Sequence, residues 1–342
     1  MTINLRTAFF VFLTVIVAFL LYTERAILTP FVLAIIFAYI FNPVINFSYR
    51  YIKLPRSISI VIIYSLIVFL LVSLGINLTK QLTNESSELK GFLNGVPEAS
   101  ENQINNLPAW IKPAAQETFA FIEKPKAISS SSVFTFFPRA LTTIIGFFIF
   151  IFAGFYFLKD GELMFKSFLN SIPGKYKSDI SLLFSKINNV LGGYLRGQVF
   201  MIFLVSLVLY LALSIVGIRF ALILAIFSGF VEIVPIIGPI FAGAIAVLIA
   251  FSSSSLSFGL GPLQGAVVVA IIYFIIRQIQ DYFVAPAVMG RIVKLHPLII
   301  LFAVLAGQHI YGTLGVILAV PVVGIIRILL EFSLEKIGKG EK

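Results

Sequence analysis

The chain has 342 residues, of which 59% are apolar and only 12% are charged, and this composition excludes an ordinary soluble protein. The net charge of +10 is compatible with an anionic partner, but basic residues also gather on the cytoplasmic side of membrane proteins, and we favour that interpretation. The sequence has no cysteine, and its two histidines, His296 and His309, form no zinc-binding pattern. We therefore expect an all-α protein that spans a membrane several times, contacts lipid and binds no nucleic acid.

Four apolar runs in the first half of the chain are long enough to cross a bilayer core of roughly 30 Å. They occupy residues 4–22, 27–48, 57–79 and 138–158. The first run follows Arg6 in the manner of a signal peptide, but no small-x-small cleavage motif follows it, so we expect a retained span. Spans at 198–217 and 264–286 bring the predicted number of full transmembrane helices to about six.

Charged residues in the connecting segments predict the orientation of these spans. Residues 50–56 and 159–196 are mainly basic and should lie in the cytoplasm, whereas residues 81–138 contain six Glu against four Lys and should lie outside. Both termini are then cytoplasmic. Within the outer segment, apolar residues of 108–124 recur at helical spacing, which predicts an amphipathic helix on the outer membrane interface, with a partner-binding surface as the alternative.

An amphipathic stripe at residues 180–194 predicts a cytoplasmic surface helix that continues into the following span. Gly193 and Gly197, four residues apart at this junction, allow two membrane helices to approach closely, either within one subunit or in a dimer. Together these patterns divide the chain into five segments. They are three N-terminal spans at 1–79, an outer helical loop at 80–137, the fourth span with the cytoplasmic helix at 138–196, a transport core at 197–335 and a cytoplasmic tail at 336–342.

Two apolar stretches, at 219–251 and 295–330, are too long for one straight span, because each would form a helix of roughly 48 Å or more. Both stretches are interrupted near the middle by residues that break or bend helices. The breaks are Pro235, Gly238 and Pro239 in the first stretch and Gly307, Gly312 and Gly315 in the second. Half-helices of about 12 to 15 residues would reach only the membrane interior, so we expect two re-entrant hairpins, with ordinary pairs of spans as the alternative.

The two broken stretches also resemble each other, since Gly229 aligns with Gly307 and Gly238 aligns with Gly315. The span before the first stretch runs from inside to outside, and the span before the second runs the other way. The sequence thus predicts an inverted repeat. Many secondary transporters have this architecture and bind their substrates near the membrane midplane, where the broken helices meet.

Glu232 lies at the first predicted hairpin tip, where a buried carboxylate is a candidate for binding a substrate or an ion. Alternatively, it accepts hydrogen bonds from amides of the next half-helix. Arg277 and Asp281, four residues apart, fit either an internal salt bridge or a pathway pair, and His309 fits either a packing residue or a proton carrier. The remaining polar pathway candidates are Gln278, Gln308 and Thr313.

The energy source is indicated by what the sequence lacks. Residues 171–178, SIPGKYKS, contain a Gly-Lys pair but not the glycine five residues upstream that a phosphate-binding loop requires, so transport would be driven by ion gradients. No nucleophile and base occur at a recognisable spacing. We therefore expect no enzyme, no catalytic residues, no metal site and no cofactor beyond a proton or a sodium ion as the coupling ion.

Three segments resemble the bacterial autoinducer-2 exporter (AI-2E) family of polytopic permeases: GGYLRGQ, EIVPIIGP and APAVMGRIVKLHPLIILFAVLAGQHIYGTLGVILAVP. The residues that fall on the motif positions are Gly197, Gln198, Pro235, Gly238, Pro286, Gly290, Pro297, Gly307, Gly312, Gly315 and Pro321. Asp281 and Gln308 depart from the family pattern, and the extra carboxylate favours an ion-coupled pathway. The resemblance implies an oligomeric permease of the bacterial inner membrane, in a family that includes signal exporters and sodium/proton antiporters.

The sequence thus predicts a secondary-active permease that exports a small polar solute, such as a signalling metabolite, by alternating access. Sodium/proton antiport through Glu232 and Asp281 is the first alternative. The second is a membrane scaffold that binds partners through its outer loop and its basic inner helix. A scaffold would not need two broken and paired hairpins, and for this reason we favour transport.

Overall fold

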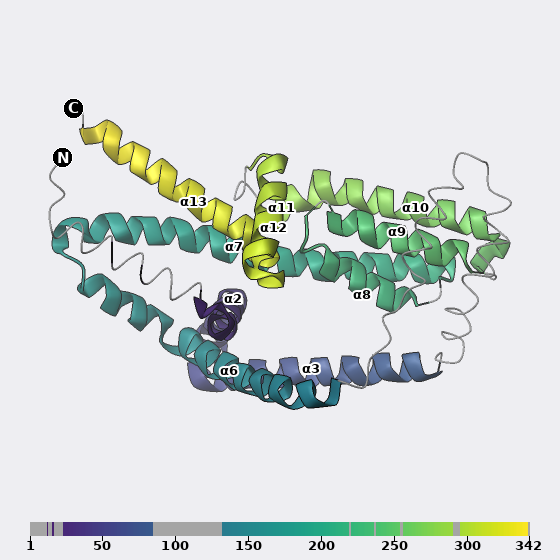
Figure 1. Cartoon of the computed structure of the whole chain (residues 1–342), viewed down its shortest axis with the longest axis horizontal. Coiled ribbons are helices and arrows are strands. Elements are labelled where there is room, and N and C mark those ends of the chain that lie inside the picture. The colour runs from purple at the N-terminus through teal and green to yellow at the C-terminus, as the bar shows by residue number, and fades with distance from the viewer. Residues whose placement is uncertain are drawn as a thin grey trace. The chain divides into compact units, whose positions relative to one another are not determined.

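The computed structural model describes residues 23–84, 132–218, 220–235, 237–253, 256–289 and 295–340, together with residues 12 and 16. Within these ranges every regular element is a helix and there is no strand, which confirms the all-α fold class (Figure 1). The predicted amphipathic helix at 108–124 and most of the predicted span at 4–22 lie outside the described residues.

The described residues divide into two compact units. The first unit contains α2, the start of α3, α6, the part of α7 up to Gly197, α12 and α13. The second contains the rest of α3, the part of α7 from Gln198 onward, and α8 to α11. The five segment boundaries predicted from the sequence stay a prediction.

In the first unit, α2 (Arg25–Phe47) ends in a short π-helix, η1 (Ser48–Ile52), before α3 (Arg56–Asn84) begins. The turn between them is fixed by the Arg56 side chain. One of its terminal nitrogens, Nη2, donates hydrogen bonds to the side-chain oxygens of Asn42 (3.0 Å) and Asn46 (3.2 Å). The other, Nη1, lies 3.6 Å from the Glu162 carboxylate.

Two predicted spans are parts of longer helices. The span predicted at 138–158 belongs to α6 (Ser132–Asn170), and the span predicted at 198–217 belongs to α7 (Gly174–Val216). The prediction that a surface helix at 180–194 runs into the following span is confirmed, because α7 is continuous over both. The first turns of α7 contact the end of α6 through stacked rings of Phe165 and Phe184, whose centroids are 3.8 Å apart.

The second predicted hairpin is formed by α12 (Pro297–Tyr311) and α13 (Thr313–Gly340), which meet at Gly312. Gly312 has a φ of 61°, a conformation that favours glycine. Beyond the turn, the backbones of Gly307 and Gly315 touch, and a Cβ atom on either residue would overlap the other residue's carbonyl group. The close packing of α12 on α13 therefore depends on these two glycines.

The expected length of 12 to 15 residues is wrong for α13, which has 28 residues. Its charge-free part ends before Arg327 and corresponds to about 21 Å of helix at 1.5 Å per residue, close to the length of α12. The continuation carries the charges, and Lys336 forms an ion pair with Asp179 of α7 at 2.6 Å. A second ion pair, between Lys186 of α7 and Glu335, also connects this continuation to α7.

The second unit contains the first predicted hairpin. Its helices are α8 (Ala221–Val231), α9 (Ile237–Phe251), α10 (Pro262–Ile279), η3 (Gln280–Val284, a π-helix) and α11 (Ala285–Met289). Small residues recur every fourth position along the buried face of α9, at Gly238, Ala242, Ala246 and Ala250. Because these residues are small, the backbone of α9 can lie close to neighbouring helices, and α9 packs against both α8 and α10 (Figure 1).

Six helices in the described ranges are long and apolar enough to cross a membrane, as expected for a multi-pass membrane protein. They cover Ile27–Ile52, Arg56–Ile76, Thr143–Asn170, Gly174–Val216, Pro262–Val288 and Thr313–Lys336. The first five correspond to predicted spans, and the last belongs to the second predicted hairpin, while the predicted span at 4–22 lies mostly outside the described residues and stays a prediction. Helices α8, α9 and α12 are shorter apolar helices, and the re-entrant course of the two hairpins and their inverted relation stay predictions.

Candidate functional site

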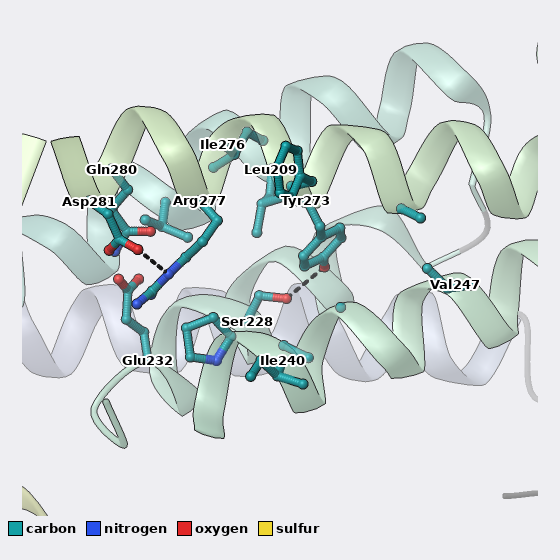
Figure 2. A pocket seen from close by; sticks show the side chains of 16 residues that line it. Leu209, Ser228, Glu232, Ile240, Val247, Tyr273, Ile276, Arg277, Gln280 and Asp281 are labelled. Atoms are coloured by element: carbon teal, nitrogen blue, oxygen red, sulfur yellow. Dashed lines mark hydrogen bonds and ion pairs between the residues drawn. The ribbon is translucent and has the colours of Figure 1, made fainter. Parts of the chain in front are cut away.

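The second unit contains a partly open cavity of about 570 Å³ between the second half of α7 and helices α8, α9 and α10. Most of its lining is apolar, but three ionisable side chains gather at one end. They are Glu232, Arg277 and Asp281, which the sequence marked as pathway candidates (Figure 2). The fold thus brings together, on one cavity, residues that are up to 49 positions apart in the sequence.

Glu232 is placed by the break between α8 and α9. It caps the C-terminus of α8, where its amide donates to the carbonyl of Ser228 at 3.2 Å. Only 7% of Glu232 is exposed, and its carboxylate oxygen Oε2 has no hydrogen-bond partner. The amides of Ile237 and Gly238, which open α9, donate instead to the carbonyls of Pro235 and Val234. Glu232 therefore does not cap these two amides.

Arg277 and Asp281 form the predicted salt bridge, with 2.8 Å between Nε of Arg277 and Oδ2 of Asp281. The prediction of an internal salt bridge is confirmed, and the same pair also lines the cavity. In Figure 2, the carboxylate of Glu232 points toward this pair. Arg277 and Asp281 are also the charged residues whose fields act on Glu232.

A change in helix type follows the salt bridge. Helix α10 passes at Gln280 into the π-helix η3, in which the amide of Ala285 donates to the carbonyl of Gln280, five residues back. Pro286 follows and has no amide hydrogen, so an α-helical bond from that position is impossible. Such π-turns are frequent at functional sites, and here the turn begins beside Asp281.

Two hydroxyl groups meet in another part of the cavity (Figure 2). The Ser228 hydroxyl donates to the carbonyl of Leu224 at 2.7 Å and lies 2.8 Å from the Tyr273 hydroxyl. Because the single hydrogen of Ser228 is already used, Tyr273 must donate in this pair. No sequence signal marked Ser228, Tyr273 or the buried Gln280 as cavity residues, since isolated polar residues in apolar helices are common.

The other candidates lie elsewhere. Gln278 is half-buried in α10 and does not line the cavity. Gln308, His309 and Thr313 are exposed near the turn between α12 and α13, in the first unit. Their predicted pathway role stays a prediction.

The structure also shows where the residues of the first predicted helix break and the two predicted packing glycines lie. Pro235 lies in the turn before α9, and Pro239 lines the cavity from the first turn of α9. The Cα of Gly238 approaches the carbonyl of Val231, where a Cβ atom would overlap it. In α7, Gly197 is buried and Gly193 half-buried, and the choice between packing within a subunit and dimerisation stays open.

The charges define what this cavity can do chemically. With all three groups ionised, two carboxylates face one guanidinium, so the lining carries one net negative charge. Arg277 is already engaged by Asp281, which leaves Glu232 without a full counter-ion. A buried carboxylate in this state favours uptake of a proton or of another cation.

The chain is similar throughout its length to transport proteins. The model of the AI-2E family transporter matches residues 8–335. Two provisionally named transport proteins of Bacillus subtilis are each 28% identical: YueF over 87% of this chain and 82% of its own length, and YrrI over 90% and 86%. A similar Synechocystis protein, sll0060, is 24% identical over 88% of this chain and 87% of its own length. Because the family model covers almost the entire chain, this membrane protein belongs to the AI-2E family of transporters.

Proposed function

We propose that this protein is a secondary-active permease of the bacterial inner membrane that exports a small solute, with both termini in the cytoplasm. A cation gradient drives export, and the coupling cation binds to the carboxylate of Glu232. Alternating access would expose the cavity of the second unit to each side of the membrane in turn. Membership of a transporter family supports the general class and makes an enzyme a poor explanation.

The observation that carries this proposal is the unsatisfied carboxylate oxygen. Glu232 is only 7% exposed, and its Oε2 atom has no hydrogen-bond partner. Burying an ionised carboxylate in this way costs free energy unless a bound cation or proton neutralises it. A structural carboxylate would be expected to spend both oxygens on amides or on an arginine. The side chain of Glu232 lines a cavity instead, which is the arrangement needed for a proton or cation that binds and leaves.

Sodium/proton antiport is a second candidate, favoured by a specific feature. Glu232 and Asp281 line the same cavity, so two carboxylates could exchange one kind of cation for another without an organic solute. In that case the apolar walls would serve only to exclude water around the ions. The two functions differ in whether cation flux requires a solute.

Flux measurements on the purified protein in proteoliposomes test the proposal. With an imposed proton or sodium gradient, we expect gradient-dependent flux from the wild type and at least a tenfold loss in Glu232→Gln, which keeps the size of the side chain but cannot bind a coupled proton. Glu331→Gln, which alters an exposed ion pair with Arg327, is the matched control and should retain its flux.

The outcomes separate the candidate functions. Exchange of sodium for protons without any added solute would establish antiport. Undiminished coupling and an unchanged pH profile in Glu232→Gln would remove this carboxylate from the mechanism. A folded protein with no flux of any tested ion or solute would favour the scaffold.

A further inference from the structure

The walls of the cavity provide a binding surface for an apolar group. Leu209 of α7, Val247 of α9 and Ile276 of α10 line it, and Phe274 and Tyr273 add aromatic side chains (Figure 2). The volume of about 570 Å³ falls within the range of roughly 300 to 1,000 Å³ that is usual for small-molecule sites. A bare inorganic ion would leave most of this space and nearly all of this surface unused.

The hydroxyl groups of the cavity offer little to a neutral polar solute. The hydroxyls of Ser228 and Tyr273 bind each other, and the proton of Ser228 goes to the carbonyl of Leu224. Among the described residues that line the cavity, Oε2 of Glu232 is the one buried side-chain atom that lacks a hydrogen-bond partner, and it can only accept hydrogen bonds or attract positive charge when ionised. The net negative charge of the lining repels an anion.

We propose that the cavity binds an amphipathic organic cation, whose charged nitrogen lies against Glu232 and whose apolar body packs on the walls formed by α7, α9 and α10. This proposal rests on the proposed function only for the claim that the bound cation is also transported. The aromatic side chains of Tyr273 and Phe274 line the same cavity and would add to the attraction where the cation lies against their π-electrons.

Binding of such a cation competes with binding of a proton. Glu232 can neutralise either one, so protonation of Glu232 removes the charge that holds the ligand.

The groups that face Glu232 are known for each neighbouring helix. Arg277 and Asp281 belong to α10 and η3, the amide of Gln198 on α7 donates to the Glu232 carbonyl at 3.4 Å, and the sequences of α8 and α9 contain no ionisable residue. Because Arg277 and Asp281 pair with each other, the proposal assigns the pH dependence to Glu232, and Glu232→Gln tests this assignment.

This competition has a consequence for transport. If one carboxylate takes either the organic cation or a proton, each outward step with the organic cation is followed by a return step with a proton. The protein would then exchange the two across the membrane, and the proton gradient would drive export without a second coupling site.

A binding assay on the detergent-solubilised full-length protein tests the inference. The probe is radiolabelled benzyltrimethylammonium, and the competitor is neopentylbenzene, in which an uncharged carbon replaces the nitrogen. We expect saturable binding at pH 8, at least tenfold weaker binding at low pH once Glu232 is protonated, and displacement by the unlabelled cation but not by neopentylbenzene. Glu232→Gln should weaken binding at least tenfold, and Glu331→Gln should leave it unchanged.

Three results would overturn the inference: no saturable binding, equal displacement by the uncharged competitor, or undiminished binding by Glu232→Gln. A matched elution profile in size-exclusion chromatography ensures that each variant is folded. Proton-coupled flux of another solute without binding of benzyltrimethylammonium would refute this inference and leave the proposed function standing. Specific binding without any flux would support this inference and contradict the proposed transport function.

Discussion

At the scale of single residues, Arg196 repairs a defect that proline introduces in another helix. Pro43 lies inside α2 and has no amide hydrogen, so the carbonyl of Tyr39, four residues earlier, loses its helical donor. Nη1 of Arg196 donates to this carbonyl at 3.3 Å. The guanidinium has room there because its neighbour in α7 is Gly192, where a Cβ atom would lie 2.8 Å from Nη1.

We therefore predict that Arg196→Met, which keeps the aliphatic part of the side chain, lowers the free energy of unfolding by about 1 kcal/mol. The effect should shrink to near zero when Pro43→Ala is also present, because an alanine at that position supplies the missing amide hydrogen. Thermal unfolding of the two single variants and the double variant in detergent measures this coupling. An equal cost of Arg196→Met in both backgrounds would show that the hydrogen bond to Tyr39 is not the cause.

The sequence could identify Glu232, Arg277 and Asp281 one at a time, because a charge within an apolar run is conspicuous. The i, i+4 spacing also predicted the salt bridge correctly. Their common cavity could not be predicted, because it depends on how α8 and α9 pack on α10. Ser228 and Tyr273 were missed for the same reason, since their hydrogen bond joins residues 45 positions apart.

At the scale of secondary-structure elements, each predicted hairpin is closed by a glycine near the start of its second helix. Gly238 packs on the carbonyl of Val231, and Gly315 packs on Gly307. The sequence predicted both break positions, because proline and glycine act locally on the backbone. It did not predict how far α13 continues, because the charged continuation of that helix is held by ion pairs to α7.

The second hairpin provides the sharper test of this packing. We predict that Gly315→Ala lowers the free energy of unfolding by roughly 1 to 3 kcal/mol, because its Cβ atom would force the α12 and α13 backbones apart. Gly146→Ala in α6 is the matched control. It has nothing within 4 Å of its Cβ position, and the change should be neutral or stabilising by up to about 1 kcal/mol. If the two variants unfold at the same temperature, the contact between Gly307 and Gly315 does not hold the hairpin together.

At the scale of the whole molecule, the charged ends of three helices indicate which side of the membrane they face. The charge-free part of α7 begins after Arg196 and corresponds to about 30 Å of helix, which is one bilayer core. The preceding turns of α7, the end of α6 and the end of α13 carry the lysines and acids, including the pair of Lys186 and Glu335 at 4.0 Å. We expect these parts to extend out of the membrane, and their excess of basic residues predicts that they lie in the cytoplasm.

The same orientation predicts the position of loops that the helices connect. Lys53 lies in the turn between η1 and α3, Lys177 lies in the first turn of α7, and Phe258 lies in the exposed connection between α9 and α10. Because the chain contains no cysteine, each can be replaced by a single Cys and labelled with a membrane-impermeant thiol reagent in intact cells. In intact cells we expect labelling at position 258 but not at positions 53 and 177. The latter two positions should be labelled once the membrane is opened. The pattern follows from the count of crossings: α7 runs outward, α8 and α9 return the chain to the outer side whether they are re-entrant or cross separately, and α10 runs inward. Labelling of position 177 in intact cells would reverse the orientation of the entire protein, and with it the side from which solute enters the cavity beside Glu232.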